Sequence, residues 1–245
     1  MESSPPLRRV QRVRHELRRR PLQVARVEPL GAGFVSVTFS GEELADFVSA
    51  SFDDHVKFIL GAETAEPVMR DYTPRSFDNA ARELTIEFAL HEAGRASAWA
   101  RQARAGDSVL VGGPRGSFIV PTDYDWHLLV GDVTALPAIR RRLEELPAGA
   151  RTIVVAHAEP DERLPLATQA DAEVHWVATP QELLTSAARL ALPAGEGFAW
   201  AGGEASVMAA LRRILREDKG LPKEAMRVAA YWKSGASAHH ENLEE

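Results

Sequence analysis

The sequence predicts a chain in two parts: a six-stranded antiparallel β-barrel, then an α/β domain with a parallel sheet. Two observations carry this prediction. Residues 22–111 hold six strand-like segments, several of them alternating apolar and polar residues, with turns between them. After residue 121, strand-like runs alternate with helical patterns, which is typical of helical crossovers. We place the domains at residues 21–122 and 123–245, after a basic tail at residues 1–20.

Composition narrows the function. The 245 residues suffice for two modest domains, and the net charge of −6 argues against nucleic-acid binding by bulk charge. The chain has no cysteine, which excludes disulfides, a cysteine-ligated iron–sulfur cluster and a cysteine nucleophile. Redox chemistry would therefore need a bound cofactor. No apolar run is long enough to cross a bilayer and no signal sequence is evident, so we expect a cytoplasmic protein, and nothing demands a partner, so we expect a monomer.

The first 20 residues carry seven arginines, and we expect a solvated, partly ordered tail. Contact with nucleic acid or acidic lipid is the alternative, but no aromatic residues interleave with the charges. The barrel strands are expected at residues 22–27, 34–40, 55–60, 70–77, 83–90 and 107–111, with one helix at about residues 96–104.

Residues 70–75 (Arg-Asp-Tyr-Thr-Pro-Arg) predict a ligand site at a strand end. Thr73 precedes a proline, which favours extended backbone, so alternate side chains face opposite sides. A guanidinium binds two phosphate oxygens at once, and a tyrosine ring can lie flat on a planar ligand. A large, partly aromatic, phosphorylated ligand such as a flavin dinucleotide fits. The alternative is an edge strand with two surface arginines and a half-buried tyrosine.

A glycine turn opens the expected helix near residue 96. Gly94, Ala96 and Ser97 would let a phosphate approach the free N–H groups of the first turn, although an ordinary N-cap explains the same residues. Residues 112–118 (Gly-Gly-Pro-Arg-Gly-Ser-Phe) form a turn-rich stretch that closes this half and projects Arg115.

The second half alternates strands and helices. We expect strands at residues 126–131, 152–156, 173–177, 197–201 and 226–232, and helices at residues 137–146, 180–190 and 204–218. Ligands bind beyond the carboxyl ends of such strands, where three turns contain glycine: residues 131–134, 201–204 and 232–235. The sequence has no G-x-G-x-x-G, so it lacks the Rossmann fingerprint.

A barrel with a phosphate-binding helix and then an α/β domain resembles the ferredoxin–NADP reductase superfamily. Within it, the sequence resembles the siderophore-interacting proteins, bacterial FAD-dependent ferric-siderophore reductases. The resemblance covers about residues 20–245 and rests on six motifs in the same order, at residues 70–75, 91–100, 112–118, 131–139, 201–204 and 231–235. It implies a reductase that passes electrons from NADH or NADPH through FAD to the ferric iron of a siderophore and releases Fe(II) in the cytoplasm.

The resemblance also implies residue roles. Tyr72 would stack on the isoalloxazine, with Thr73 near its reactive edge, and these two are the candidate catalytic residues. The further cofactor contacts, on the flavin, its phosphates and the nicotinamide side, would be Arg70, Arg75, His91, Gly94, Ala96, Ser97, Asp132, Thr134, Ala135 and Pro137. A basic surface would attract the anionic ferric siderophore through Lys57, Arg115 and Lys233. The iron arrives inside the substrate, so no protein metal site is expected.

The sequence departs from the family in three places. Arg95 stands where proline is usual, Val133 where glutamate is frequent, and Lys233 where arginine is usual. The first alters the helix start, and the last keeps the charge but loses the planar fork. Acidic residues at 159, 161 and 162 suit a ribose diol and repel a 2′-phosphate, which favours NADH over NADPH, with Arg163 as the opposing feature.

Alternatives stay open from the sequence. The chain could be a general flavin or ferredoxin-linked reductase whose acceptor is not a siderophore, or a siderophore-binding flavoprotein without catalysis. A ferredoxin could replace the nicotinamide as donor. The class of siderophore is not determined.

Overall fold

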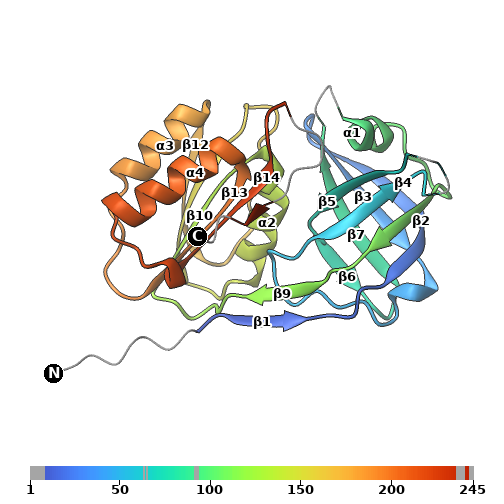
Figure 1. Cartoon of the computed structure of the whole chain (residues 1–245), viewed down its shortest axis with the longest axis horizontal. Helices are drawn as coiled ribbons and strands as arrows, with labels where there is room; N and C mark the ends of the chain where they lie inside the picture. The colour runs from blue at the N-terminus through green and yellow to red at the C-terminus, as the bar shows by residue number, and fades with distance from the viewer. Residues whose placement is uncertain (1–8, 63, 65, 91–93, 236–240, 243–245) are drawn as a thin grey trace.

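Two sheets, one antiparallel and one mainly parallel, form the two halves of the molecule (Figure 1). The computed structural model describes residues 9–62, 64, 66–90, 94–235 and 241–242. Within these residues no helix is both long enough and apolar enough to span a membrane. The predicted combination of an antiparallel β half and an α/β half is confirmed.

The antiparallel half is a seven-stranded sheet in the order β5-β4-β8-β2-β3-β7-β6. Its large aromatic side chains, among them Phe39, Phe58 and Phe88, pack together in one core with the short helix α1 (Arg95–Ala100). The strands are β2 (Arg19–Leu30), β3 (Phe34–Ser40), β4 (Val56–Leu60), β5 (Val68–Tyr72), β6 (Ser76–Asp78), β7 (Glu83–Ala89) and β8 (Ser108–Gly112), and a 3₁₀ turn, η1, covers Glu42–Leu44.

The prediction of one strand over residues 70–77, and so of six strands, is wrong in detail. That segment forms β5 and β6, which lie at opposite edges of the sheet and are joined by residues 73–75. Pro74 cannot donate to a strand ladder, so the pairing breaks there. Four residue steps span at most about 14 Å. The sheet must therefore curl until its two edges are close, and residues 73–75 bridge that seam.

The second half is a six-stranded sheet in the order β12-β11-β10-β13-β14-β15, parallel except for its last strand. The five predicted strands and three predicted helices are confirmed. The strands are β10 (Trp126–Asp132), β11 (Arg151–His157), β12 (Asp171–Val177), β13 (Gly197–Glu204), β14 (Met226–Trp232) and β15 (Glu241–Asn242). The helical segments are η2 (Val133–Ala135), α2 (Leu136–Glu145), α3 (Pro180–Arg189), α4 (Ala205–Arg213), the π-helical η3 (Ile214–Asp218) and η4 (Lys223–Ala225).

The chain order of this sheet reverses between β10 and β13, which are neighbours. The chain moves outward from β10 through β11 to β12, then returns across the sheet to β13 and β14. Loops that leave the carboxyl ends of two such neighbouring strands run in opposite directions and leave a crevice between them. Topology therefore places the candidate nucleotide crevice beside Asp132 and Glu204, the last residues of β10 and β13.

The arginine-rich segment does not behave as a solvated tail from residue 9 onward. Strand β1 (Gln11–Arg14) pairs with β9 (Gly116–Ile119), and the two run along one side of the molecule beneath both halves (Figure 1). Arg9 forms ion pairs with Asp123 and Glu196 at the second half. Arg20 is buried in the barrel, where Nε donates to the carbonyl of Glu43 over 2.8 Å. Edge pairing and ion pairs thus order residues that alternation alone would not assign to a strand.

The two halves share an apolar core around α2, which lies between them (Figure 1). Phe34 of β3 and Phe52 belong to the same buried cluster as Leu136, Ile139 and Trp200 from the second half. Burial of apolar surface on this scale makes the relative placement of the halves part of the fold.

Candidate functional site

Tyr72 ends β5 at the edge of the antiparallel sheet. Its ring centroid lies 4.4 Å from that of Phe88 and 5.8 Å from that of Phe58, which it meets edge-on. Burial raises the pKa of its hydroxyl above the ordinary value, so Tyr72 is neutral at physiological pH. The core therefore holds a neutral, partly exposed aromatic ring in one orientation. Thr73 follows it and is buried at the seam.

Alternate residues of β5 face opposite sides, as the sequence predicted. Arg70 lies opposite Phe58 in the pairing with β4, and its Nη1 donates to the carbonyl of Met69 over 2.8 Å. No carboxylate among the described residues forms an ion pair with Arg70. Asp71 faces the other side, where it accepts from Lys57 Nζ over 2.6 Å. Arg70 is thus a cation available to an anionic ligand.

Helix α1 begins beside this strand. Gly94 is its N-cap and makes no side-chain capping hydrogen bond, while Ala96 and Ser97 are buried. The helix ends at Ala100, several residues short of the prediction, and Trp99 stacks nearly parallel on Phe39 at 6.2 Å. His91, another predicted contact, lies outside the described residues. Small residues at this turn leave backbone N–H groups open to approach.

Asp132 organises the crevice at the end of β10. Its Oδ1 accepts from the backbone N–H and the hydroxyl of Thr134, over 2.9 and 2.5 Å. Its Oδ2 accepts from the backbone N–H of Glu204 over 3.0 Å. Ala135 and Pro137, also predicted at the nicotinamide side, are buried and form the start of α2. Asp132 and Thr134 therefore form the hydrogen bonds of the turn, and Ala135 and Pro137 pack in the core at the start of α2.

Two residues of the motifs at 201–204 and 231–235 were given no role from the sequence. Trp232 donates from Nε1 to Asp132 Oδ2 over 2.9 Å and leaves 42% of its surface exposed at the end of β14. Glu204 caps α4 by accepting from the N–H groups of Ser206 and Val207. Burial alone would raise the pKa of Glu204, but these hydrogen bonds outweigh it and lower the pKa. The signal in the sequence was an aromatic residue and an acid at the carboxyl ends of two strands of the parallel sheet.

The flavin-side strand and the crevice are connected by α2. Arg141 of α2 donates from Nη1 to the carbonyl of Pro74 over 2.8 Å, and Glu144 of α2 pairs with Arg75. The same helix starts in the turn that follows Asp132. One helix therefore connects the two predicted cofactor regions.

The three cations predicted to attract a siderophore differ in their surroundings. Lys57 lies opposite Gly112 and beside Asp71, its ion-pair partner. Arg115 is exposed in the turn after β8, and Lys233 is exposed directly after β14. Arg19 lies across Gly112 from Lys57, since both are register partners of Gly112. The sequence analysis counted Arg19 in the basic tail and not among these cations.

Arg75 is engaged differently from Arg70. Its guanidinium forms ion pairs with Glu87 of β7 and Glu144 of α2, and only 9% of the residue is exposed. The predicted flavin contact at Arg75 thus faces two carboxylates that belong to opposite halves of the molecule.

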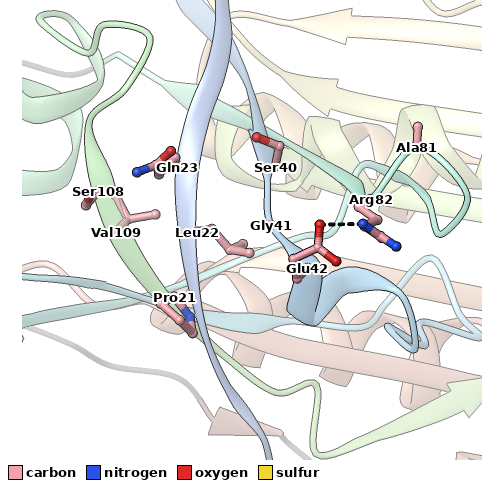
Figure 2. A pocket seen from close by; sticks show the side chains of 10 residues that line it. All are labelled: Pro21, Leu22, Gln23, Ser40, Gly41, Glu42, Ala81, Arg82, Ser108 and Val109. Atoms are coloured by element: carbon pink, nitrogen blue, oxygen red, sulfur yellow. Dashed lines mark hydrogen bonds and ion pairs between the residues drawn. The ribbon is translucent and has the colours of Figure 1, made fainter.

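A shallow hollow of about 500 Å³ lies elsewhere on the barrel (Figure 2). Its wall is formed by Pro21, Leu22, Gln23, Ser40, Gly41, Glu42, Ala81, Arg82, Ser108 and Val109. Glu42 and Arg82 form an ion pair at its rim (Figure 2). None of these residues is a predicted site residue. Over the part of the chain that is described, no group of three metal-ligating side chains occurs.

The chemistry of the cofactor region fits a flavin dinucleotide. Arg70 has no competing carboxylate among the described residues, Gly94 leaves its helix start without a side-chain cap, and the partly exposed ring of Tyr72 is held in place by Phe88. A pyrophosphate needs a cation and N–H donors, and an isoalloxazine needs a flat apolar wall. These residues supply all three.

Comparisons with known proteins agree with this geometry. Residues 23–66 and 61–118 match the family model of the siderophore-interacting FAD-binding domain, and residues 124–235 match that of the siderophore-interacting protein. An Escherichia coli (strain K12) protein named NADPH-dependent ferric-chelate reductase is 38% identical, over 91% of this chain and 96% of its own length. The Vibrio cholerae ferric vibriobactin reductase ViuB is 26% identical, over 91% and 93%.

Solved structures show the same arrangement. A siderophore utilization protein from T. fusca superposes with a TM-score of 0.86 at 34% identity, covering 94% of this chain and 98% of its own. The siderophore-interacting protein SipS from Aeromonas hydrophila gives 0.78 at 29% identity, covering 89% and 93%. The ferredoxin reductase of carbazole 1,9a-dioxygenase, at 17% identity and 0.65, shares the fold. The chain belongs to the siderophore-interacting protein family.

Proposed function

We propose that this protein is an FAD-dependent reductase of ferric siderophores that draws electrons from NAD(P)H and releases Fe(II) in the cytoplasm. The observation that carries the proposal is that α2, which starts at the crevice of the parallel sheet, contacts Pro74 and Arg75 directly after the flavin-side strand β5. A flavin strand and a nucleotide crevice at one place are what electron transfer between two cofactors requires. The family and the names of the relatives support the same activity.

The reaction suits the residues. When bound, FAD supplies the ability to accept a hydride and to give up electrons singly to ferric iron. Tyr72 would form an aromatic wall for the flavin ring, with Thr73 beside it. Arg70 and the backbone near Gly94, Ala96 and Ser97 would hold the phosphates, and Asp132 and Thr134 would hold the nicotinamide side. Ferrous iron is softer than ferric iron and is held less tightly by oxygen donors, so reduction loosens the chelate.

The basic surface selects the substrate. Lys57, Arg115 and Lys233 attract an anionic ferric chelate, because a local field steers ligands even when the net charge is negative. Lys57 pairs with Asp71, the neighbour of Tyr72 in β5, which supports a short path from the chelate to the flavin.

For the donor, we infer NADPH in place of the NADH that the acidic loop predicted. Glu162 packs against Gly33 of the barrel, and its Oε2 accepts from the N–H of Glu159 over 3.0 Å. The carboxylate of Glu162 therefore stabilises its own loop and is less available to accept hydrogen bonds from the ribose of a nicotinamide cofactor. The Escherichia coli relative is named as NADPH-dependent. A higher kcat/KM with NADH than with NADPH would contradict this inference.

The test is the visible spectrum of the purified protein under anaerobic conditions. We expect a flavin spectrum that bleaches with NADPH and recovers when a ferric siderophore is added together with a ferrous-specific chelator. Bleaching without recovery would favour a reductase with another acceptor. Siderophore binding with no turnover would favour a non-catalytic flavoprotein, and bleaching only with reduced ferredoxin would change the donor. We expect a monomer by sedimentation.

A further inference from the structure

A charge cluster is buried where the two halves meet. The Oε1 atom of Glu87, on β7, lies 3.3 Å from Arg75 Nε and also pairs with Nη1 of Arg140 from α2. The side chains of Arg75, Glu87 and Arg140 are 10%, 5% and 12% exposed. One carboxylate oxygen therefore joins two arginines, one from each half.

The two arginines stand next to the two cofactor regions. Arg75 comes two residues after Thr73 at the barrel seam, where its N–H donates to the carbonyl of Thr85 over 2.9 Å. Arg140 comes three residues after Pro137, in the first turns of the helix that starts at the nicotinamide-side turn. The link through Glu87 thus runs from the flavin strand to the nicotinamide helix.

Helix α2 contacts the same seam with two more side chains. Arg141 Nη1 donates to the carbonyl of Pro74 over 2.8 Å, and Glu144 pairs with Arg75. Arg141 also donates to Ser49, from Nη1 to the hydroxyl and from Nη2 to the carbonyl. Pro74 and Arg75 are therefore contacted by two side chains of α2, and Arg140 reaches the same seam through Glu87.

Glu87 is the only carboxylate of this cluster that pairs with both Arg75 and Arg140. Its Oε2 is buried and has no hydrogen-bond partner among the described residues, so its charge is balanced by the two arginines alone. Without the carboxylate, two cations would face each other where little water screens them. Glu144 is 43% exposed, so water screens its contribution far more.

We propose that Glu87 is a positioning residue that fixes the flavin strand against the nicotinamide helix and so sets the hydride-transfer distance. The proposal rests on the proposed function. A helix moves as a rigid rod, so a shift at Arg140 moves the turn at Asp132 and Thr134. A misplacement of about 1 Å between reacting groups can cost about 100-fold in rate.

The test compares Glu87→Gln with Glu83→Gln. Glu83 is on the same strand and pairs with Arg26, but within the barrel, so it is a matched control. In cofactor-free protein, we expect amide hydrogen exchange at residues 73–77 and 136–145 to accelerate at least tenfold in Glu87→Gln only. In FAD-loaded protein, we expect the limiting rate of flavin reduction by NADPH to fall at least tenfold, with unchanged affinity for FAD.

A second reaction separates positioning from general damage. Oxidation of chemically reduced flavin by ferric chelate does not use the nicotinamide and should stay within twofold of wild type in Glu87→Gln. If that variant does not fold, Arg140→Gln breaks the link from the other side and leaves Glu87 paired with Arg75. A lowered Tm with an unchanged limiting rate, or unchanged exchange, would overturn the proposal. Wild-type protein that binds no FAD would refute the proposed function instead, whereas the exchange experiment would stand.

Discussion

Trp232 Nε1 donates to Asp132 Oδ2 over 2.9 Å and thereby ties the end of β14 to the end of β10. The same oxygen accepts from the N–H of Glu204 at the end of β13, so one carboxylate joins three strand ends. Each of its two oxygens accepts two hydrogen bonds. An amide in the same place presents an oxygen to only one of these two sets of donors.

Replacing Asp132 by asparagine should disorganise the crevice. The amide nitrogen must face at least one backbone N–H donor, so at least one hydrogen bond is lost, at about 1–3 kcal/mol. We expect KM for NADPH to rise and kcat to fall, together about tenfold or more, and the emission of Trp232 to shift. Asp125→Asn is the control, because Asp125 directly precedes the other end of β10. There its carboxylate accepts a hydrogen bond from the backbone N–H of Glu196. Equal effects of both variants would refute the role of Asp132.

Arg70→Ala should weaken FAD binding. A charge-assisted hydrogen bond to phosphate contributes about 1.5–3 kcal/mol, which corresponds to about a 10- to 100-fold rise in Kd. Fluorescence titration of cofactor-free protein with FAD measures this rise. Arg26→Ala removes an arginine that pairs with Glu83 within the barrel and should leave Kd unchanged. An unaltered Kd in Arg70→Ala would remove Arg70 from the site.

Neutralising the basic surface should affect the chelate and not the nicotinamide. In a variant with Lys57, Arg115 and Lys233 all changed to glutamine, we expect KM for an anionic ferric siderophore to rise about tenfold, with KM for NADPH within twofold. Wild-type KM should rise with ionic strength and the variant should respond less, because salt screens exposed charges. An uncharged ferric chelate serves as the control substrate. No change with the anionic chelate would favour another acceptor.

His127 should make the fold sensitive to acid. The side chain is buried, and burial, with help from Arg142, lowers its pKa from 6.5 to about 4. Between pH 6.5 and pH 4, His127 is therefore protonated in the unfolded chain but not in the folded chain. The free energy of unfolding falls as the pH drops through this range. The loss between pH 7 and pH 5 is about 2 kcal/mol from this group.

Urea unfolding of wild type and His127→Phe at pH 7 and pH 5 measures the contribution of His127. That contribution is the difference between the two proteins in the free energy of unfolding lost on acidification. Burial raises the pKa of Asp54, which works in the opposite direction, but that contribution is common to both proteins. We expect the wild type to lose about 2 kcal/mol more than the variant on acidification. An identical loss would show that His127 is protonated in the folded state.

Deleting residues 1–20 should now destabilise the protein, contrary to the expectation for a free tail. The deletion removes β1, the first strand residues paired with β8, and the buried Arg20, which bonds to Glu43 and Gly113. We expect a lower Tm and reduced reductase activity at 37 °C. Arg14→Gln keeps the strand and should retain both. A deletion variant with wild-type Tm would show that the β1–β9 pairing contributes nothing.

Most of the fold followed from local patterns. The buried runs 126–131 and 197–201 predicted strands because they are short, apolar and flanked by turns, and the helices between them began at proline or acidic caps. Strands β1 and β9 escaped notice because they do not alternate clearly and are held by pairing with each other. Residues 70–77 were predicted as one strand although they contain Pro74, so the crossing of the chain from one sheet edge to the other was missed.

The sequence by itself determined the order of elements, the absence of cysteine chemistry and the motifs that predict flavin and nucleotide binding, because these depend on residues close together in the chain. Only the tertiary structure decided which distant side chains meet. In the folded protein Arg75 forms ion pairs with Glu87 and Glu144. Trp232 donates a hydrogen bond to Asp132, which lies 100 positions away in the sequence. Buried charges must find partners wherever the sheets bring them, and no local pattern contains that information.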